Sequence, residues 1–592
     1  MRQSPSLNAD KIKSLVNVAI GKEQADSVIV GGDLINVYTG EILKGWSVAI
    51  KGDRIAYVGE DAEHTIGPDT EVLDASGKTL VPGFIDGHAH VMHTHGTIEE
   101  FLKHVTKSGT TTIISETLDF AFALGYEGVI DFLESVKDQP IKIFATAPST
   151  FANGQPDYKD VITPDEFRKL LEREEIMGVG ESNWVPVIRG DEQVLNLFAE
   201  TLFYGKTLEG HSSGARNSKL VAFVASGNSS DHEPIATEEV LERLRLGMCV
   251  MMREGDVRND LEAIAAIKDE KIDFRRLSVT TDGIGAKHLI EHGYVDSIVQ
   301  KAIDLGFNPI TAIQMATLNV AEHFHIDNIV GGIAPGKCAD IVVLPNVTTI
   351  KPEVVISNGQ IVSKDGKLLV EPRTHSYPDR ARNTVRIPRE LSADDFAVRV
   401  DGSHKYITAR VIDIGHDIAN KLAELSLPVI DGELKVDVQN DILKVAAIDR
   451  IHNSGKMFVG LVKGFGLKKG AFAATAAWDV CNVVVIGASE EDMAVAVNRV
   501  RELQGGPVVF ADGEIKAELP MPIAGQTSEL PMEEIARHLE DIQNQVANLG
   551  SQVTYAHLML NTLTTTIVPA VRISTGGLID VKTGGILDFI VG

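Results

Sequence analysis

Residues 81–325 alternate short apolar runs with stretches of helical periodicity, and this alternation restricts the possible folds more than any other feature. The apolar runs include 111–115, 141–147, 178–181, 220–226 and 277–282. Strands that alternate with helices form parallel sheets, and a segment of this length suits a closed (β/α)8 barrel. Functional side chains of such barrels lie at the carboxyl ends of the strands, so the polar residues after each run are the candidates for a site.

Two β-rich segments flank this predicted barrel. Short strands at close spacing, separated by Gly, Asp and Asn turns, occupy residues 25–80 and return over 326–376. We therefore expect one composite β-sandwich domain that is built from both segments. Residues 1–24 are predicted to contain a separate amphipathic helix, over 8–22.

A third unit follows the second β-rich segment. Residues 372–394 are polar and contain three prolines, which is typical of a linker. The remaining chain, 390–592, has short strands, a helical pattern over 490–503 and a hairpin pattern over 507–514. We predict a C-terminal α+β domain for this part of the chain.

The composition excludes one class of partner. The 592-residue chain has a formal net charge of −27, which argues against binding to nucleic acid, because phosphates are bound by clustered Lys and Arg. Cys249, Cys338 and Cys481 are too widely spaced for a disulfide framework or a thiolate metal site. No apolar run approaches the length of a membrane span and the N-terminus is polar, so we expect a cytoplasmic protein without a membrane partner.

The first predicted barrel strand, over 80–85, leads into two histidines, His88 and His90. Residues i and i+2 of a strand point to the same face, so the two imidazoles would meet at one point. Two converging neutral imidazoles form half of a transition-metal site. The alternative is a pair of solvated loop histidines, and the choice depends on further ligands downstream.

Further candidate ligands follow other apolar or glycine-rich runs, namely Glu181, His211, His232 and Asp282. Taken singly, the acids could instead start helices and the histidines could lie on the surface. Taken together with the first two histidines, they form a set of four imidazoles and two carboxylates. Such a set suits Mn²⁺, Fe²⁺ or Zn²⁺, and six ligands with one shared carboxylate suit two ions.

These motifs resemble those of the adenine deaminases within the amidohydrolase superfamily. The resemblance extends from about residue 25 to the C-terminus and is carried by the stretches 82–90, 108–112, 209–211, 230–233, 253–255, 281–282, 316–319, 336–343, 462–467, 492–498 and 519–525. The last three stretches are the ones that distinguish this family from other amidohydrolases.

The resemblance implies a barrel with two divalent ions, most simply Mn²⁺ or Fe²⁺ with Zn²⁺ as a third option. The implied ligands are His88, His90, Glu181, His211, His232 and Asp282, with Glu181 bridging the ions. Because ligand imidazoles must be neutral, we expect metal occupancy to fall as the pH drops through about 6.5.

The reaction implied by the resemblance is hydrolysis of a carbon–nitrogen bond in a cyclic amidine, as in the conversion of adenine to hypoxanthine in purine metabolism. Hydroxide would attack the aromatic carbon that carries the amino group, and ammonia would leave. Asp282 would accept the proton of the attacking water and pass it to the leaving amine. Glu233, next to His232, is a second candidate catalytic carboxylate.

Several loops depart from the family pattern although every metal position is kept. Family members have Ile-Glu-Ser-Ser where this chain has 91–95, and Asp-Pro-His-Glu where it has 115–118; residues 283–285 and 478–482 also differ. Loops after barrel strands often contact the substrate. We therefore expect that a related amino-heterocycle, and not adenine, is the preferred substrate.

Four residues in or near these loops are candidates for substrate binding. His93 and His95 either bind substrate or are solvated, and Glu116 and Arg253 could hold a polar ligand, with an internal ion pair as the alternative for Arg253. The expected partners are a small-molecule substrate and other copies of the chain, in a homodimer or a higher homo-oligomer.

Two other functions stay open. One is an amidohydrolase that acts on a different amino-heterocycle or a cyclic amide. The other is a metal-binding homologue without catalysis. Asp282 argues against the second, because a purely structural metal site needs no base beside an open coordination position.

Overall fold

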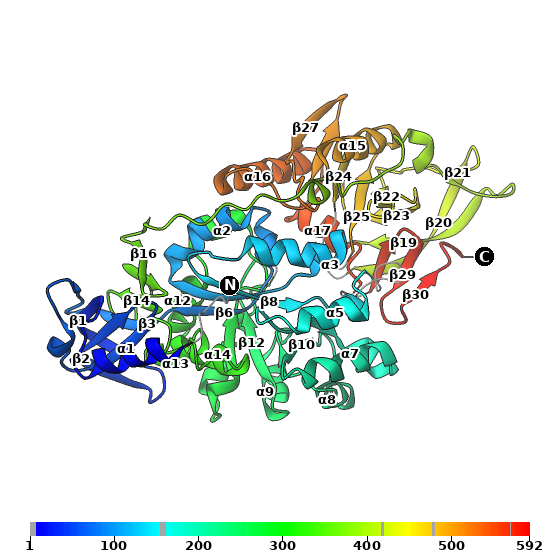
Figure 1. Ribbon diagram of the computed structural model, residues 1–592. Helices are drawn as coiled ribbons and strands as arrows, with labels where there is room; N and C mark the ends of the chain where they lie inside the picture. Colours follow the sequence, from blue (N-terminus) through cyan, green and yellow to red (C-terminus); the bar gives the residue numbers. More distant parts are fainter. Residues whose placement is uncertain are drawn as a thin grey trace.

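The computed structural model describes residues 7–153, 161–256, 258–415, 420–475, 480–566, 568 and 570–591. A barrel occupies the centre of the molecule, a β domain lies at one end, and the C-terminal region covers another side (Figure 1). Among the described residues, no helix is long and apolar enough to cross a membrane.

The barrel is a ring of parallel strands, and the predicted (β/α)8 fold is confirmed. Its strands in the described chain are β6 (Phe84–Ala89), β7 (Thr110–Ser115), β8 (Lys142–Ala147), β9 (Ile176–Asn183), β10 (Thr207–His211), β11 (Ser230–Asp231), β12 (Cys249–Arg253) and β13 (Leu277–Thr280). The ring closes where the residues after β13 return to β6, through a parallel bridge between Ala89 and Asp282.

Helices surround this ring. They are α2 (Ile98–Val105), α3 (Leu118–Ser135), α4 (Thr150–Asn153), α5 (Pro164–Leu171), α6 (Trp184–Arg189), α7 (Glu192–Phe203), α8 (Ser218–Ala225), α9 (Thr237–Arg245), α10 (Leu261–Ile264), α11 (Ala286–His292), α12 (Val295–Asp304), α13 (Pro309–Met315) and α14 (Leu318–His323). The prediction of a strand over 220–226 is wrong, because these residues lie in and at the end of helix α8. Leu220 and Phe223, three residues apart, are buried while Val221 is exposed, which is a helical and not a strand periodicity.

The prediction of a single strand over 80–85 is also wrong. These residues belong to two strands in different sheets. β5 (Thr79–Pro82) lies in the flanking sheet and β6 begins the barrel. The break falls at Gly83, where a Cβ atom would lie 2.1 Å from the Thr111 hydroxyl. The chain therefore passes from one sheet into the other through a position where only glycine fits.

The flanking domain draws its strands from both sides of the barrel. Within the described residues they form one nine-stranded sheet, from β1 (Ser27–Asn36), β2 (Glu41–Lys51), β3 (Arg54–Gly59), β4 (Glu71–Asp74), β5, β14 (Ile341–Leu344), β15 (Val354–Ser357), β16 (Gln360–Lys364) and β17 (Lys367–Leu368). The pairing of β5 with β14 joins the two segments. Helix α1 (Ala9–Ala19), which Asn8 caps, packs on the first segment.

The C-terminal region contains a large, mostly antiparallel sheet. Its described strands are β18 (Val398–Arg399), β19 (Tyr406–Asp413), β20 (Lys421–Ile430), β21 (Glu433–Leu434), β22 (Ile442–Asp449), β23 (Met457–Lys463), β24 (Ala471–Thr475), β25 (Asn482–Gly487), β26 (Val508–Ala511), β27 (Glu514–Glu518) and β31 (Ile590–Val591). The predicted hairpin is the antiparallel pair β26–β27. The other elements of this region are α15 (Glu490–Leu503), α16 (Met532–Asn548), α17 (Ala556–Thr562), β28 (Val571–Ser574), β29 (Gly577–Asp580) and β30 (Gly585–Leu587).

A buried ion pair connects the barrel to the flanking domain. Lys142, at the start of β8, donates to both carboxylate oxygens of Asp340 at 2.8 and 2.7 Å. Only 1% of the Lys142 side chain and 5% of the Asp340 side chain are exposed. Asp340 also accepts from the backbone N–H of Asn358 at 2.9 Å. Because removal of one partner would leave the other charge buried and unpaired, loss of either side chain alone is expected to destabilise the protein strongly.

Lys142→Met is expected to destabilise the protein by roughly 3 kcal/mol, the usual cost of breaking a buried pair. The double variant Lys142→Met, Asp340→Leu should recover part of that loss, because neither charge remains unpaired. Thermal unfolding at a fixed scan rate measures both. Lys137→Met, which removes an exposed pair with Glu134 at 3.3 Å, is the control, and an equal shift for Lys137→Met and Lys142→Met would contradict the prediction.

Candidate active site

Six side chains meet at the carboxyl ends of the barrel strands, and all are buried: His88, His90, Glu181, His211, His232 and Asp282. Their possible ligand atoms form three overlapping groups, His88 with His232 and Asp282, His88 with His90 and Glu181, and Glu181 with His211 and His232. Within each group the ligand atoms lie within 4.8 Å of one another. The structure therefore brings together all six residues that the sequence indicated as metal ligands.

Glu181 is the centre of this cluster. One of its oxygens lies 3.2 Å from His90 Nε2, and the other forms an ion pair with His211 Nδ1 and lies 3.6 Å from His232 Nε2. The two oxygens of one carboxylate thus face different histidines. This is the arrangement that a carboxylate shared by two ions requires.

Asp282 is held in place by its own backbone. Its φ of +59° is in the left-handed region, which Asp adopts more readily than most residues. The Asp282 N–H donates to the His88 carbonyl at 3.2 Å, and the Asp282 carbonyl accepts from the His90 N–H at 2.6 Å. The Asp282 carboxylate then lies 3.6 Å from both His88 Nε2 and His90 Nε2.

A second carboxylate, Asp86, connects strand β6 to the end of strand β13. It is fully buried and accepts from the hydroxyls of Thr280 and Thr281, at 2.6 Å in each case. Burial raises the pKa of Asp86 and these hydrogen bonds oppose the rise. Asp86 thus contributes to the position of His88, two residues further along β6, without belonging to the cluster.

The carboxylates of the cluster raise the pKa values of three of its imidazoles, His88, His90 and His211, in the absence of metal. Burial lowers the pKa of His90, but the hydrogen bond and the charge of Glu181 outweigh burial and raise it to about 9. Burial likewise lowers the pKa of His211, and the charges of Glu233 and Glu181 raise it to about 9. Conversely, burial raises the pKa of Glu181, but His211 and the other histidines bring it well below its usual value.

This donor set fits a divalent metal centre. Imidazole nitrogens and carboxylate oxygens are the preferred ligands of first-row divalent ions. His88 Nε2 is buried and lies 3.6 Å from Asp282 Oδ1, which is beyond hydrogen-bond distance. A metal ion bound between His88 Nε2 and Asp282 Oδ1 would give both atoms a partner that they do not provide for each other.

Glu116 contacts two of the candidate ligands, His88 and Glu181. Its Oε1 lies 3.5 Å from His88 Nδ1 and accepts from the Glu181 backbone N–H at 3.2 Å. A Cβ atom at Gly180 would lie 2.1 Å from the other Glu116 oxygen, so Gly180 leaves the space that Glu116 occupies. Binding of substrate by Glu116 stays a prediction.

Arg253 and Glu233 form an ion pair beside the cluster. Arg253 also lies 3.0 Å from Asp260 and 3.4 Å from Asp282 Oδ2. Glu233 lies 3.5 Å from His232 Nε2. Burial raises the pKa of Glu233, but the charge of Arg253 outweighs it and lowers the pKa to about 2. The structure shows the ion-pair alternative for Arg253, while a substrate-binding role for it stays a prediction.

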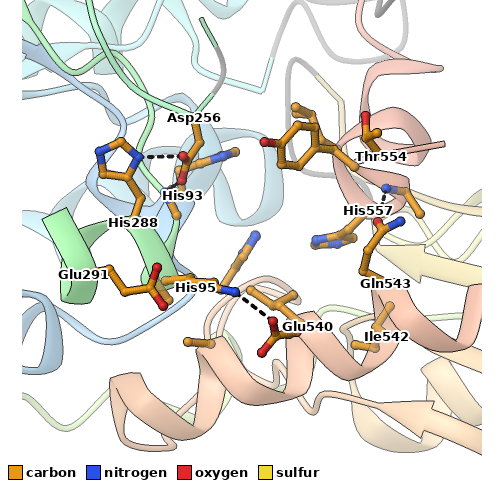
Figure 2. A pocket seen from close by; sticks show the side chains of 18 of the residues that line it. His93, His95, Asp256, His288, Glu291, Glu540, Ile542, Gln543, Thr554 and His557 are labelled. Atoms are coloured by element: carbon orange, nitrogen blue, oxygen red, sulfur yellow. Dashed lines mark hydrogen bonds and ion pairs between the residues drawn. The ribbon is translucent and has the colours of Figure 1, made fainter. Parts of the chain in front are cut away.

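His93 and His95 lie on a 3-10 turn, η2 (Val91–Thr94), and at its end. They line a cavity of about 600 Å³ between the barrel and the C-terminal region. Figure 2 shows this cavity with barrel residues such as Asp256 and His288 on one side and residues of α16 and α17 on the other. His288 Nδ1 is 2.9 Å from Asp256. None of the six candidate ligands lines this cavity, but two of its lining residues, His93 and Gly285, follow His90 and Asp282 by three residues each.

The sequence reasoning missed several residues that line this cavity, namely Asp256, His288 and His557. Asp256 follows the strand end at Arg253 and could have been found by extending the search three residues. His557 carries no such signal, because only the folded chain brings it to the barrel. Of the altered stretch 478–482, Trp478 and Asp479 lie outside the described residues.

Comparisons with known proteins cover nearly the whole chain. A model of the adenine deaminase C-terminal domain matches residues 417–584, and a model of the amidohydrolase family matches residues 79–369. The chain is 37% identical over 590 residues to an adenine deaminase from Moorella thermoacetica, with 99% of each chain covered. It is 36% identical over 575 residues to one from Clostridium botulinum (strain Langeland), with 96% of each chain covered.

A solved structure is also similar, with lower identity. It is a beta-aspartyl dipeptidase from Fervidobacterium islandicum, 17% identical, with a TM-score of 0.46 and coverage of 60% of this chain and all of that one.

Metal binding by this cluster is expected to release protons and to strengthen as the pH rises to about 9. Below that pH His90 and His211 are protonated in the metal-free protein, because their pKa values are about 9, and a metal ion requires the neutral ring. This window lies above the one near ~6.5 that unperturbed imidazoles give, because the neighbouring carboxylates stabilise the protonated rings of His90 and His211.

Calorimetric titration with Mn²⁺ in buffers of different ionisation enthalpy measures both the affinity and the protons released. An affinity that stays constant between pH ~6.5, the usual histidine pKa, and ~9 would contradict the prediction.

Proposed function

Because this chain belongs to the adenine deaminase family of amidohydrolases, we propose that it hydrolyses adenine to hypoxanthine and ammonia with two bound divalent ions. The observation that carries the proposal is the position of Glu181, which belongs to two of the buried ligand groups. Mn²⁺ or Fe²⁺ suits these ligands, with Zn²⁺ as the third option.

Two overlapping sets of residues would hold the ions. His88, His90 and Asp282 would bind one ion, His211 and His232 the other, and Glu181 would be shared. When bound, the ions would lower the pKa of water to ~7, so that hydroxide is available at neutral pH.

Asp282 is the general base and acid in this proposal. Burial raises the pKa of Asp282, but the hydrogen bond with His88 and the charges of His232 and Arg253 keep it low, so the carboxylate is ionised. It accepts one proton as the water oxygen bonds to the ring carbon. It then delivers that proton to the amino nitrogen, the carbon–nitrogen bond breaks, and ammonia leaves.

Glu233 and Arg253 form an ion pair next to Asp282. The Glu233 carboxylate faces His211 and His232, at 3.6 and 3.5 Å, and its ion pair with Arg253 keeps it ionised. We assign Glu233 as a second catalytic carboxylate that orients the attacking water. Arg253 contacts both Glu233 and Asp282 and fixes their separation.

Adenine is the substrate that the family relationship favours. Relatives that align with nearly the whole chain carry the name adenine deaminase. These relatives do not favour our expectation from the changed loops that another amino-heterocycle is preferred to adenine, nor the alternatives of a cyclic-amide substrate or a non-catalytic metal protein. Three residues of the changed loops, His93, His95 and Gly285, line the cavity, where they would affect substrate binding more than the hydrolytic step.

Asp282→Asn is expected to lower kcat for adenine by at least ~100-fold, because an amide does not accept the proton of water. The variant should retain part of its metal, since five candidate ligands remain. Ammonia release and metal content by elemental analysis are measured on the same sample. Near wild-type turnover by metal-loaded Asp282→Asn would show that Asp282 is not the base.

The proposed reaction itself is tested by ammonia release from adenine with Mn²⁺-loaded protein. A panel of other aminopurines, aminopyrimidines and pterins gives the ranking of substrates. We expect adenine to show kcat/KM of at least ~10⁴ M⁻¹s⁻¹, as for a working enzyme. Fully metal-loaded protein that releases no ammonia from adenine would refute the proposal.

A further inference from the structure

The cavity that His93 and His95 line is formed between two separate parts of the chain. Its barrel side includes His95 and helix α11, and its other side consists of α16, the segment before α17 and the start of α17 (Figure 2). The C-terminal region is fixed to the barrel at this point, because the backbone N–H of Ser528 donates to the His95 carbonyl at 2.8 Å. The side chain of Gln526 also donates to the carbonyl of Asp119 at 2.8 Å.

The tautomer of His95 follows from its hydrogen bond. His95 Nδ1 lies 3.1 Å from the carbonyl oxygen of Gln526. A carbonyl only accepts, so Nδ1 carries the proton and Nε2 carries a lone pair. Burial, together with the neighbouring His557 and His93, lowers the pKa of His95 well below its usual value. His95 is therefore a neutral ring whose remaining nitrogen accepts a hydrogen bond.

His557 lies next to His95 from the C-terminal region. The two ring centroids are 5.0 Å apart. His557 Nε2 is buried and has no hydrogen-bond partner in the part of the chain that the structure describes. Burial lowers the pKa of His557 to about 4, and His93 adds to this effect. A neutral ring nitrogen that is buried without a partner at the wall of a cavity is suited to bind a ligand, since an unmade hydrogen bond there costs free energy.

Two of the three carboxylates that line the cavity are paired with basic side chains of the lining. Lys287 lies 2.7 Å from Glu540, and His288 lies 2.9 Å from Asp256. Glu291 adds a further negative charge to the lining. A phosphate group would meet more carboxylates than cations here, so an uncharged base is favoured over a nucleotide.

We infer that His95 and His557 are specificity-determining residues that bind the purine base, with His95 Nε2 accepting from a ring N–H and His557 Nε2 bonding a second polar atom. This inference rests on the proposed function, because the cavity then holds the substrate beside the metal cluster. It adds a residue of the C-terminal domain to the substrate site, and it restricts the substrate to free bases that carry a ring N–H.

The matching experiment compares adenine with 7-methyladenine and 9-methyladenine, in which a methyl group replaces a ring N–H. Wild-type protein should show kcat/KM at least ~10-fold lower for both methylated bases, because neither retains a ring N–H and the His95 acceptor then lacks its donor. In His95→Asn this difference should shrink below about threefold. Asn keeps a donor near the Gln526 carbonyl and suits the positive φ of 60° at this position, but it lacks the Nε2 acceptor.

His557 is tested by a pair of variants. His557→Phe keeps an aromatic ring without nitrogen and should raise KM for adenine about 10-fold with kcat within about threefold. His557→Gln places an amide near the position of Nε2 and should restore most of the affinity. His538→Phe, on the same region of the chain, is the control, because His538 bonds the Glu518 carbonyl at 3.0 Å and does not line the cavity.

Calorimetric binding of the product base, hypoxanthine, separates this inference from the proposed reaction. If wild-type protein releases no ammonia from adenine but binds hypoxanthine, and His557→Phe does not bind it, the reaction is refuted and the inference stands. If wild-type protein deaminates adenine while His95→Asn and His557→Phe match it in KM, in hypoxanthine affinity and in discrimination against methylated bases, the inference is overturned.

Discussion

Closure of the barrel between its first and last strands is the constraint on which the site depends. The backbone of Asp282 exchanges hydrogen bonds with His88 and His90, so residues nearly two hundred positions apart share one register. Side chains alternate along a strand, and a slip of one residue would turn His88 away from the cluster. Asp86 reinforces the same register through Thr280 and Thr281. Fold and site are therefore specified by the same contacts.

The cluster also carries an electrostatic cost that metal binding would offset. Glu181 and Asp282 are buried, and an ionised carboxylate is stable there only beside positive charge or hydrogen-bond donors. In the metal-free protein His90 and His211 supply that charge by holding protons, because the neighbouring carboxylates raise their pKa values to about 9. Divalent ions would replace those protons, so that metal binding is coupled both to pH and to stability.

Much of this arrangement could be predicted from the sequence, because strand ends and ligand residues are local features. The six candidate ligands follow apolar or glycine-rich runs, and the barrel follows from their alternation with helices. The split at Gly83 could not be predicted, because it depends on the distant side chain of Thr111. The contribution of His557 depends on how the C-terminal region packs on the barrel, and no local pattern contains that information.

Anomalous X-ray diffraction from crystals of Mn²⁺-loaded protein tests the central claim most directly. A pair of ions shared by one carboxylate predicts two anomalous peaks, one on each side of Glu181, with His88, His90 and Asp282 around one peak and His211 and His232 around the other. The same crystals of Glu181→Gln should lose at least one peak. A single peak in the wild-type protein, or peaks away from Glu181, would contradict the account.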